Sequence, residues 1–93
     1  MIISFKDKDT ELIFNQEFSK RFPISIQKTA LKKLIMIDNA KSIQDLKIPP
    51  SNKLESLKGD RLGQYSIRIN RKYRICFRFD GRFYSDVEIV DYH

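Results

Sequence analysis

The chain has 93 residues, 41% of them hydrophobic and 12% aromatic, and carries a formal net charge of +6. This composition supports one compact domain over residues 1–93 and excludes a disordered chain or a membrane-spanning helix. Charged residues begin at Lys6, which argues against a secretory leader. One cysteine and one histidine are too few for an internal disulfide or a metal site. We therefore expect a soluble cytoplasmic protein that needs no cofactor and binds no membrane.

A short strand and a helix are expected at the start of the chain. Residues 2–5 are mostly apolar and predict the strand, and Asp7 or Asp9 can cap the helix that follows. Phenylalanines at four-residue spacing predict about three turns for this helix: Phe14, Phe18 and Phe22. We expect Phe14 and Phe18 to lie in the core.

A second helix of about four turns is expected after Pro23, because proline suits a first helical turn. Its apolar stripe consists of Ile26, Ala30, Leu31, Leu34 and Ile37. The residues expected to face water are Gln27, Lys28, Lys32 and Lys33. A short helical turn over residues 42–46 follows. Pro49 and Pro50 then interrupt regular structure, because proline donates no backbone hydrogen bond.

The rest of the chain predicts an antiparallel meander of three strands at about 64–70, 73–79 and 83–90. Apolar and polar residues alternate there, which gives a sheet one face of each kind. The first two strands place on the polar face Ser66, Arg68, Asn70, Arg74, Cys76 and Arg78. Two helices followed by this meander predict an α+β fold, with both N-terminal helices packed on one face of a twisted antiparallel sheet.

Matching the apolar faces of neighbouring strands predicts how the strands pair. Ile67 is expected opposite Ile75, which sets Arg68 opposite Arg74. A three-residue loop over residues 80–82 then joins the last two strands. The partners expected across that pair are Phe79 with Phe83, Arg78 with Tyr84, Ile75 with Val87 and Arg74 with Glu88.

Positive charge is concentrated in residues 47–82, which hold ten basic side chains, three acidic ones and six of the seven arginines. The planar fork of arginine suits phosphate, so this cluster favours a polyanionic partner. Nucleic acid ranks ahead of a membrane because no amphipathic helix shares the charge, and an acidic protein segment fits as well. The candidate RNA-binding residues are Lys53, Arg61, Arg68, Arg71, Lys72 and Arg78.

The last three residues carry groups that can move protons. RNA can be cleaved by attack of its own 2′-oxygen on the adjacent phosphate, which needs a base, an acid and cations but no metal ion. Asp91, Tyr92 and His93 supply a carboxylate, a phenol and an imidazole, and Arg74 is expected beside them. Each group also has a structural interpretation, such as an ordinary cross-strand ion pair for Arg74. The residues alone favour a binding module over an RNA-cleaving site.

Four segments carry a family resemblance: NKLESLKGDR at residues 52–61, YSIRIN at 65–70, YRICF at 73–77 and VEIVDYH at 87–93. With the start of the chain, they resemble the HigB plasmid-maintenance killer toxins of the RelE/ParE superfamily. The resemblance implies a RelE-like fold with the element order β-α-α-β-β-β. It further implies a type II toxin that enters the A site of the 70S ribosome and cuts mRNA as a metal-independent endoribonuclease.

The resemblance also implies a partner and a set of site residues. The partner is a HigA-like helix-turn-helix antitoxin, through which alone the chain would meet operator DNA. The implied catalytic positions are Lys58, Arg74, Asp91, Tyr92 and His93. Some relatives carry a histidine on the preceding loop where this chain has Glu55, so the work of the base would pass to Glu55 or His93. The alternatives are a non-catalytic module that binds nucleic acid or protein, and a ParE-like inhibitor of DNA gyrase.

Overall fold

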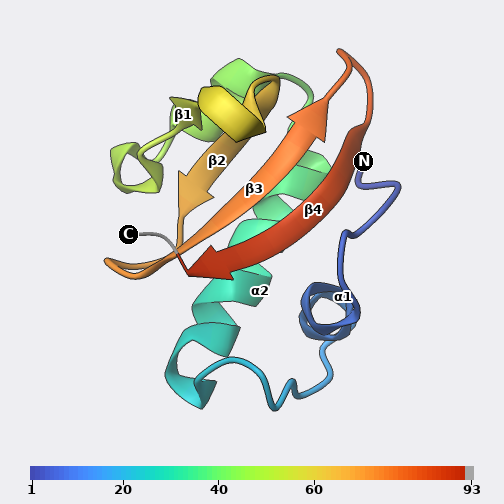
Figure 1. The fold of residues 1–93 in the computed structure, drawn as a ribbon, viewed down its shortest axis with the longest axis vertical. Helices are drawn as coiled ribbons and strands as arrows, with labels where there is room; N and C mark the ends of the chain where they lie inside the picture. Colours follow the sequence, from blue (N-terminus) through green and yellow to red (C-terminus); the bar gives the residue numbers. More distant parts are fainter. Residues whose placement is uncertain (92–93) are drawn as a thin grey trace.

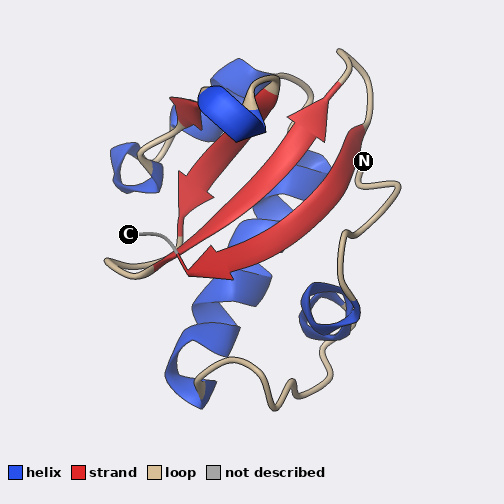
Figure 2. Cartoon of the chain, in the orientation of Figure 1, coloured by secondary structure: helices blue, strands red, loops and turns tan. Residues whose placement is uncertain are grey.

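Four antiparallel strands form one sheet in the order β1-β2-β3-β4, and helix α2 crosses behind it (Figure 1). The computed structural model describes residues 1–91. The strands are Glu55–Ser56 (β1), Gln64–Arg68 (β2), Tyr73–Phe79 (β3) and Tyr84–Asp91 (β4). The helices are Lys8–Phe14 (α1) and Ile24–Asn39 (α2), with 3₁₀ turns at Ile43–Lys47, Pro50–Asn52 and Gly59–Arg61. The predicted α+β fold, two helices packed against an antiparallel sheet, is confirmed (Figure 2).

Helix α2 packs one side on the sheet. Its buried stripe includes the predicted residues Ile26, Ala30, Leu34 and Ile37. Among the described residues, no helix is both long and apolar enough to cross a bilayer. Lys33, expected to face water, is instead only 8% exposed, and its ammonium donates a hydrogen bond to Oδ1 of the fully buried Asn52. This hydrogen bond offsets part of the free-energy cost of burying the lysine ammonium.

Helix α1 is shorter than predicted. Asp7 caps it, because its Oδ1 accepts a hydrogen bond from the backbone N–H of Thr10 at 2.7 Å. The helix has seven residues and ends at Phe14, and Gln16 then adopts the left-handed conformation with φ +64°. Phe18 therefore lies outside the helix and is 59% exposed. Its predicted place in the core is wrong.

The opening segment forms two isolated parallel bridges with β4 rather than a regular strand. Ile2 pairs with Tyr84, and Phe5 pairs with Val87. The backbone N–H of Ile3 donates to the carbonyl of Tyr84 at 2.8 Å, and the N-terminus lies beside β4 (Figure 1). The segment thus covers the outer edge of the sheet, which would otherwise present unpaired backbone groups.

Strands β2 and β3 pair as predicted, with Ile67 opposite Ile75 and Arg68 opposite Arg74. The two-residue strand β1, which sequence reasoning missed, pairs with the other edge of β2. Because β1 directly follows the short loop at residues 53–54, it brings that loop to the edge of the sheet near Arg74.

The register between β3 and β4 differs from the prediction. Tyr84, not Phe83, lies opposite Phe79, because the connecting loop has four residues and not three. A β-bulge that contains Asp86, with φ +51°, adds a second one-residue shift. The two shifts together move the register by two residues. Beyond the bulge, each side chain of β4 therefore lies on the predicted face of the sheet, apolar or polar. The observed partners are Ile75 with Ile89, Arg74 with Val90, Cys76 with Glu88 and Arg78 with Ser85. The predicted pairs Ile75–Val87, Arg74–Glu88 and Arg78–Tyr84 are wrong.

Candidate functional site

The face of the sheet turned away from α2, here called the open face, carries polar side chains. Figure 1 views the sheet from this side, with α2 behind it. Strands β2, β3 and β4 place on it Gln64, Ser66, Arg68, Arg74, Cys76, Arg78 and Glu88. The alternation that the sequence predicts for β2 and β3 is therefore confirmed.

Arg74 lies at the centre of the polar interactions on this face and is only 6% exposed. Its Nε donates to Oγ of Ser66 at 2.8 Å, and its Nη2 donates to the carbonyl oxygen of Lys53. Its Nη1 lies 3.8 Å from Oε1 of Glu55. These partners belong to β2, to the loop before β1 and to β1 itself. The guanidinium is therefore held in one orientation by three separate segments.

Arg74 forms part of the wall of a concave pocket of about 320 Å³, here called the arginine pocket. Its lining residues are Lys53, Glu55, Arg68, Asn70, Arg71 and Arg74. Four of the six are cations and one is a carboxylate, so the pocket attracts an anion while keeping one proton acceptor beside it. The planar forks of Arg68 and Arg71 can each donate two parallel hydrogen bonds to a tetrahedral oxyanion.

Two local conformations build this pocket. Lys53 adopts a left-handed backbone with φ +47°, which ends the preceding 3₁₀ turn and directs its carbonyl toward Arg74. Oδ1 of Asn70 accepts backbone hydrogen bonds from Lys72 at 2.9 Å and from Tyr73 at 2.8 Å. This side-chain cap closes the tight connection from β2 to β3 and places residue 71 at its tip.

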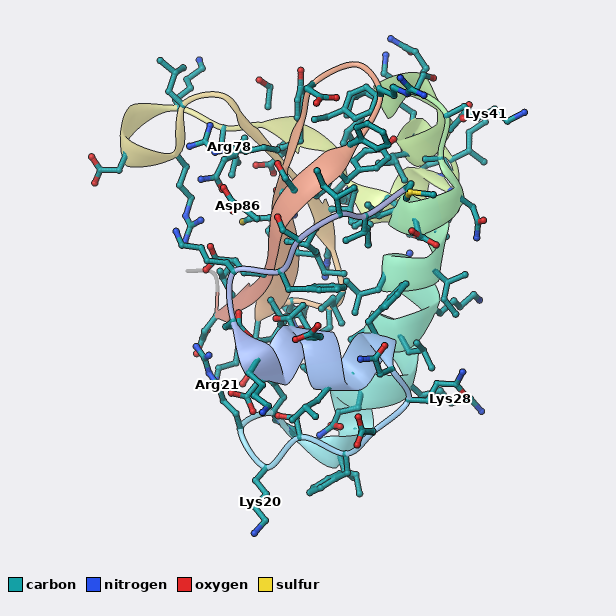
Figure 3. The ribbon with its side chains drawn as sticks, turned by 90° about the vertical axis from the view of Figure 1, so that its right-hand side faces the viewer. Lys20, Arg21, Lys28, Lys41, Arg78 and Asp86 are labelled. Atoms are coloured by element: carbon teal, nitrogen blue, oxygen red, sulfur yellow. The ribbon has the colours of Figure 1, made fainter. Side chains whose placement is uncertain are left out.

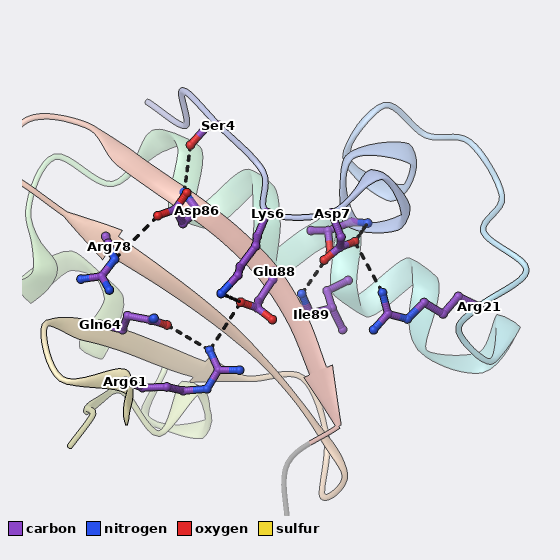
Figure 4. A network of polar contacts seen from close by, with 11 residues as sticks. Ser4, Lys6, Asp7, Arg21, Arg61, Gln64, Arg78, Asp86, Glu88 and Ile89 are labelled. Atoms are coloured by element: carbon purple, nitrogen blue, oxygen red, sulfur yellow. Dashed lines mark hydrogen bonds and ion pairs between the residues drawn. The ribbon is translucent and has the colours of Figure 1, made fainter. Parts of the chain in front are cut away.

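A second group of cations on the open face is paired with carboxylates (Figure 4). Oε2 of Glu88 accepts a hydrogen bond from Nη1 of Arg61 at 3.4 Å and forms an ion pair with Nζ of Lys6 at 3.5 Å. Nε of Arg78 lies 3.7 Å from Oδ2 of Asp86, and the two side chains lie side by side (Figure 3). These cations are neutralised locally and do not line the arginine pocket.

Cys76 lies between the two groups and is fully buried. Burial raises the pKa of its thiol, nearby Arg61 opposes that rise, and Glu88 adds to it. The thiol is therefore protonated near neutral pH and acts as a small packed side chain. Within residues 1–91, no group of three or more His, Cys, Asp or Glu side chains is placed to hold a metal ion.

The structure brings together part of the predicted site. Of the predicted catalytic residues, Arg74 lines the arginine pocket, whereas Lys58 is exposed just before the turn at Gly59–Arg61 and does not line it. Asp91 lies opposite Tyr73 at the end of β4, and its Oδ2 lies 3.7 Å from Nζ of Lys72. The predicted residues Tyr92 and His93 lie outside the described residues.

The predicted RNA-binding residues divide in the same way. Lys53, Arg68 and Arg71 line the arginine pocket, whereas Arg61, Lys72 and Arg78 do not. Sequence reasoning missed Asn70 as a pocket residue. The sequence does contain a pattern that could have identified it, because an asparagine before two basic residues between strands is typical of a side-chain-capped turn.

The fold is shared with solved toxin structures. A chain of the YoeB–YefM toxin–antitoxin complex from Staphylococcus aureus matches with a TM-score of 0.60 and 22% identity, covering 100% of this chain and 98% of that one. YafQ from Escherichia coli BL21(DE3) matches with a TM-score of 0.57 and 13% identity, covering 98% and 93%. The chain therefore has the RelE-type fold of small toxins.

Sequence similarity narrows this class to a family. The family model described as "RelE-like toxin of type II toxin-antitoxin system HigB" matches residues 3–93. Toxin HigB-1 of Vibrio cholerae serotype O1 is 40% identical over 83 residues, which cover 87% of each chain. Endoribonuclease HigB of Proteus vulgaris is 34% identical over 93 residues, which cover 100% of each chain. The chain belongs to the HigB-like toxin family of type II toxin–antitoxin systems.

Proposed function

We propose that the chain is an endoribonuclease that cuts mRNA in the ribosomal A site and is held inactive by a HigA-like helix-turn-helix antitoxin. The arginine pocket is the observation that carries this proposal. It gathers four cations and one carboxylate on an open sheet face, in a chain whose relative from Proteus vulgaris is named an endoribonuclease. Operator DNA would be contacted through the antitoxin alone.

The proposed chemistry is attack of a ribose 2′-oxygen on the adjacent phosphate, with no metal ion in the step. Negative charge builds on the pentacoordinate phosphate, and donors already fixed in place stabilise it without reorganising. Arg74 meets that requirement because Ser66 and the Lys53 carbonyl hold its guanidinium. Arg68 and Arg71 would supply further donors from the same pocket.

The proposed base is Glu55, which is the carboxylate among the pocket's lining residues. It would remove the proton from the 2′-hydroxyl, and Tyr92 and His93 would align the nucleotide and protonate the departing 5′-oxygen. Lys58 and the paired cations Arg61, Lys72 and Arg78 would contact the RNA backbone outside the pocket. Asp91, as the last residue of β4, would position the two residues that follow it.

The Glu55→Gln variant tests the proposed base. We expect the single-turnover cleavage rate on translating ribosomes to fall about 10²- to 10⁴-fold, the usual size of a general-base contribution. Folding should persist, because the Glu55 side chain is 47% exposed and Arg74 keeps its other partners. Glu11→Gln, at an exposed position on α1, is the matched control. Cleavage by Glu55→Gln at the wild-type rate would assign the base elsewhere.

The proposed activity is tested by inducing the chain in bacteria and mapping mRNA 5′ ends. We expect new ends, in frame, only within translated RNA. The double variant Tyr92→Phe, His93→Gln should produce none and should no longer arrest growth, while it still binds the antitoxin. Asp91 is left intact because it pairs with Tyr73 in the sheet. Growth arrest by the double variant would instead favour a binding module or a gyrase inhibitor.

A further inference from the structure

A second concave pocket, of about 490 Å³, lies between α2 and the end of β2, and is here called the α2 pocket. Ile69 and Asn70, just after β2, form part of its wall. The charged and hydroxyl side chains that line it come from α2, from the 3₁₀ turn Pro50–Asn52, from the loop before β1 and from β2: Thr29, Lys32, Lys33, Ser51, Lys53 and Arg68. Four of these side chains are cations and two are hydroxyls. Among the described residues, no carboxylate lines it. This set of donors matches the acceptor oxygens of a phosphate group.

The two pockets are adjacent because they share Lys53, Arg68 and Asn70 in their walls. An anion in either pocket would therefore lie within reach of the same two cations. Consecutive phosphates of one RNA strand are separated by a single nucleotide, so a strand that enters the arginine pocket can present its next phosphate to the α2 pocket.

We propose that the α2 pocket binds the phosphodiester adjacent to the one cleaved, on the same RNA strand. The inference rests on the proposed function, because it takes the arginine pocket to hold the scissile phosphate. It assigns Lys32, Lys33 and the hydroxyls of Thr29 and Ser51 to binding the strand rather than to the reaction.

Lys33 contributes a buried cation to this pocket, held in place by a hydrogen bond. Its side chain is almost fully buried, and the buried Asn52 accepts one of the three hydrogen bonds that an ammonium can donate. Burial lowers the pKa of Lys33, and the neighbouring charge of Lys32 lowers it further. An anion in the pocket would offset both effects, so phosphate binding would favour the charged lysine.

The test measures how much an added phosphate strengthens binding of a short RNA to the full-length chain. The probes are a 2′-O-methylated dinucleotide with one internal phosphodiester and the same molecule with a 5′- or a 3′-phosphate. Methylation blocks the attacking oxygen, so the probes stay intact. We expect one of the two added phosphates to tighten binding several-fold. That phosphate should also steepen the dependence of log Kd on log salt by about 0.7, the value for one further phosphate contact on single-stranded nucleic acid.

Lys32→Gln should remove most of this gain while leaving affinity for the dinucleotide unchanged. Lys32 is chosen because it is exposed, whereas Lys33 has a buried partner. Lys28→Gln is the matched control. It removes the same charge from the same helix at a side chain that projects outward and does not line the pocket (Figure 3). The control should retain the full gain.

Three results would overturn the inference. The first is tight binding of the dinucleotide with no gain from either terminal phosphate, which would leave the proposed cleavage at the arginine pocket intact. The second is an equal loss, in Lys28→Gln, of the affinity gained from the added phosphate, which would show that the effect depends only on net charge. The third is a full gain in Lys32→Gln combined with slower cleavage on ribosomes, which would assign the pocket to a ribosomal phosphate. Failure of the proposed function itself would appear separately, as absence of new mRNA ends.

Discussion

Replacing Arg74 with lysine is expected to lower the cleavage rate about 10²- to 10³-fold, the usual loss when one fixed donor to a developing oxyanion is removed. Lysine keeps the positive charge, but its single ammonium cannot reach Ser66, the Lys53 carbonyl and a phosphate together. The measurement is single-turnover cleavage of mRNA on translating ribosomes. Arg82→Lys, at an exposed position in the β3–β4 loop, is the matched control and should cleave normally. Cleavage by Arg74→Lys within threefold of the wild type would remove Arg74 from the reaction.

Measuring the stability of Arg74 variants distinguishes a role in the reaction from a purely structural role. Arg74 is buried and hydrogen-bonded, so Arg74→Ala should lower the free energy of unfolding by about 2–3 kcal/mol. The cross-strand pair with Glu88 expected from the sequence would have predicted a much smaller cost. Arg74→Lys should lose less stability than Arg74→Ala yet lose nearly as much activity. Parallel losses of activity and stability in the two variants would mean that Arg74 acts only by holding the loop before β1.

Asn52→Ala is expected to lower the free energy of unfolding by about 3 kcal/mol. Asn52 is fully buried, accepts from the Lys33 ammonium and donates to the carbonyl of Leu46 at 3.1 Å. Removing it leaves a buried charge without its acceptor. Urea unfolding measures the loss, and cleavage should also fall because the neighbouring Lys53 carbonyl orients Arg74.

A double variant provides the control for this effect. Lys33→Met replaces the charge with an apolar chain of similar length, so Lys33→Met combined with Asn52→Ala should be more stable than Asn52→Ala alone. The coupling free energy from the double-mutant cycle should therefore be well above the few tenths of a kcal/mol found for independent sites. Additive losses would show that Asn52 acts by packing and not as the acceptor for Lys33.

The parts of the fold set by local periodicity could be predicted from the sequence. The stripe along α2 and the alternation along β2 and β3 appear where expected, because both depend on side-chain spacing alone. The length of α1 did not follow from spacing. Phe18 continues the phenylalanine repeat but is exposed, whereas Phe22 reaches the core from the segment before α2 and packs edge-on against Tyr73 at 5.9 Å between ring centroids.

The site was predicted only in part because long-range contacts build it. Arg74 meets the Lys53 carbonyl across 21 residues of sequence, through a left-handed residue and a two-residue strand that leave almost no pattern. The sequence pattern places Lys33 on the solvated side of α2, because its acceptor lies 19 residues away and leaves no local signal. The cationic face was therefore predictable, whereas the choice of cations that converge in one pocket was not.

The hairpin between β3 and β4 shows how two extra residues, one in the loop and one in the bulge, determine where negative charge lies on the sheet. Oδ1 of Asp80 accepts from the backbone N–H groups of Arg82 and Phe83, which stabilises the longer loop. That loop alone would invert the rest of β4 and turn Glu88 inward against Ile75. The bulge reverses the inversion, so Glu88 faces outward again, but opposite Cys76. Its carboxylate consequently neutralises Lys6 and Arg61. The paired residues Arg68 and Arg74, two residues further along the strands, therefore keep their attraction for an incoming polyanion.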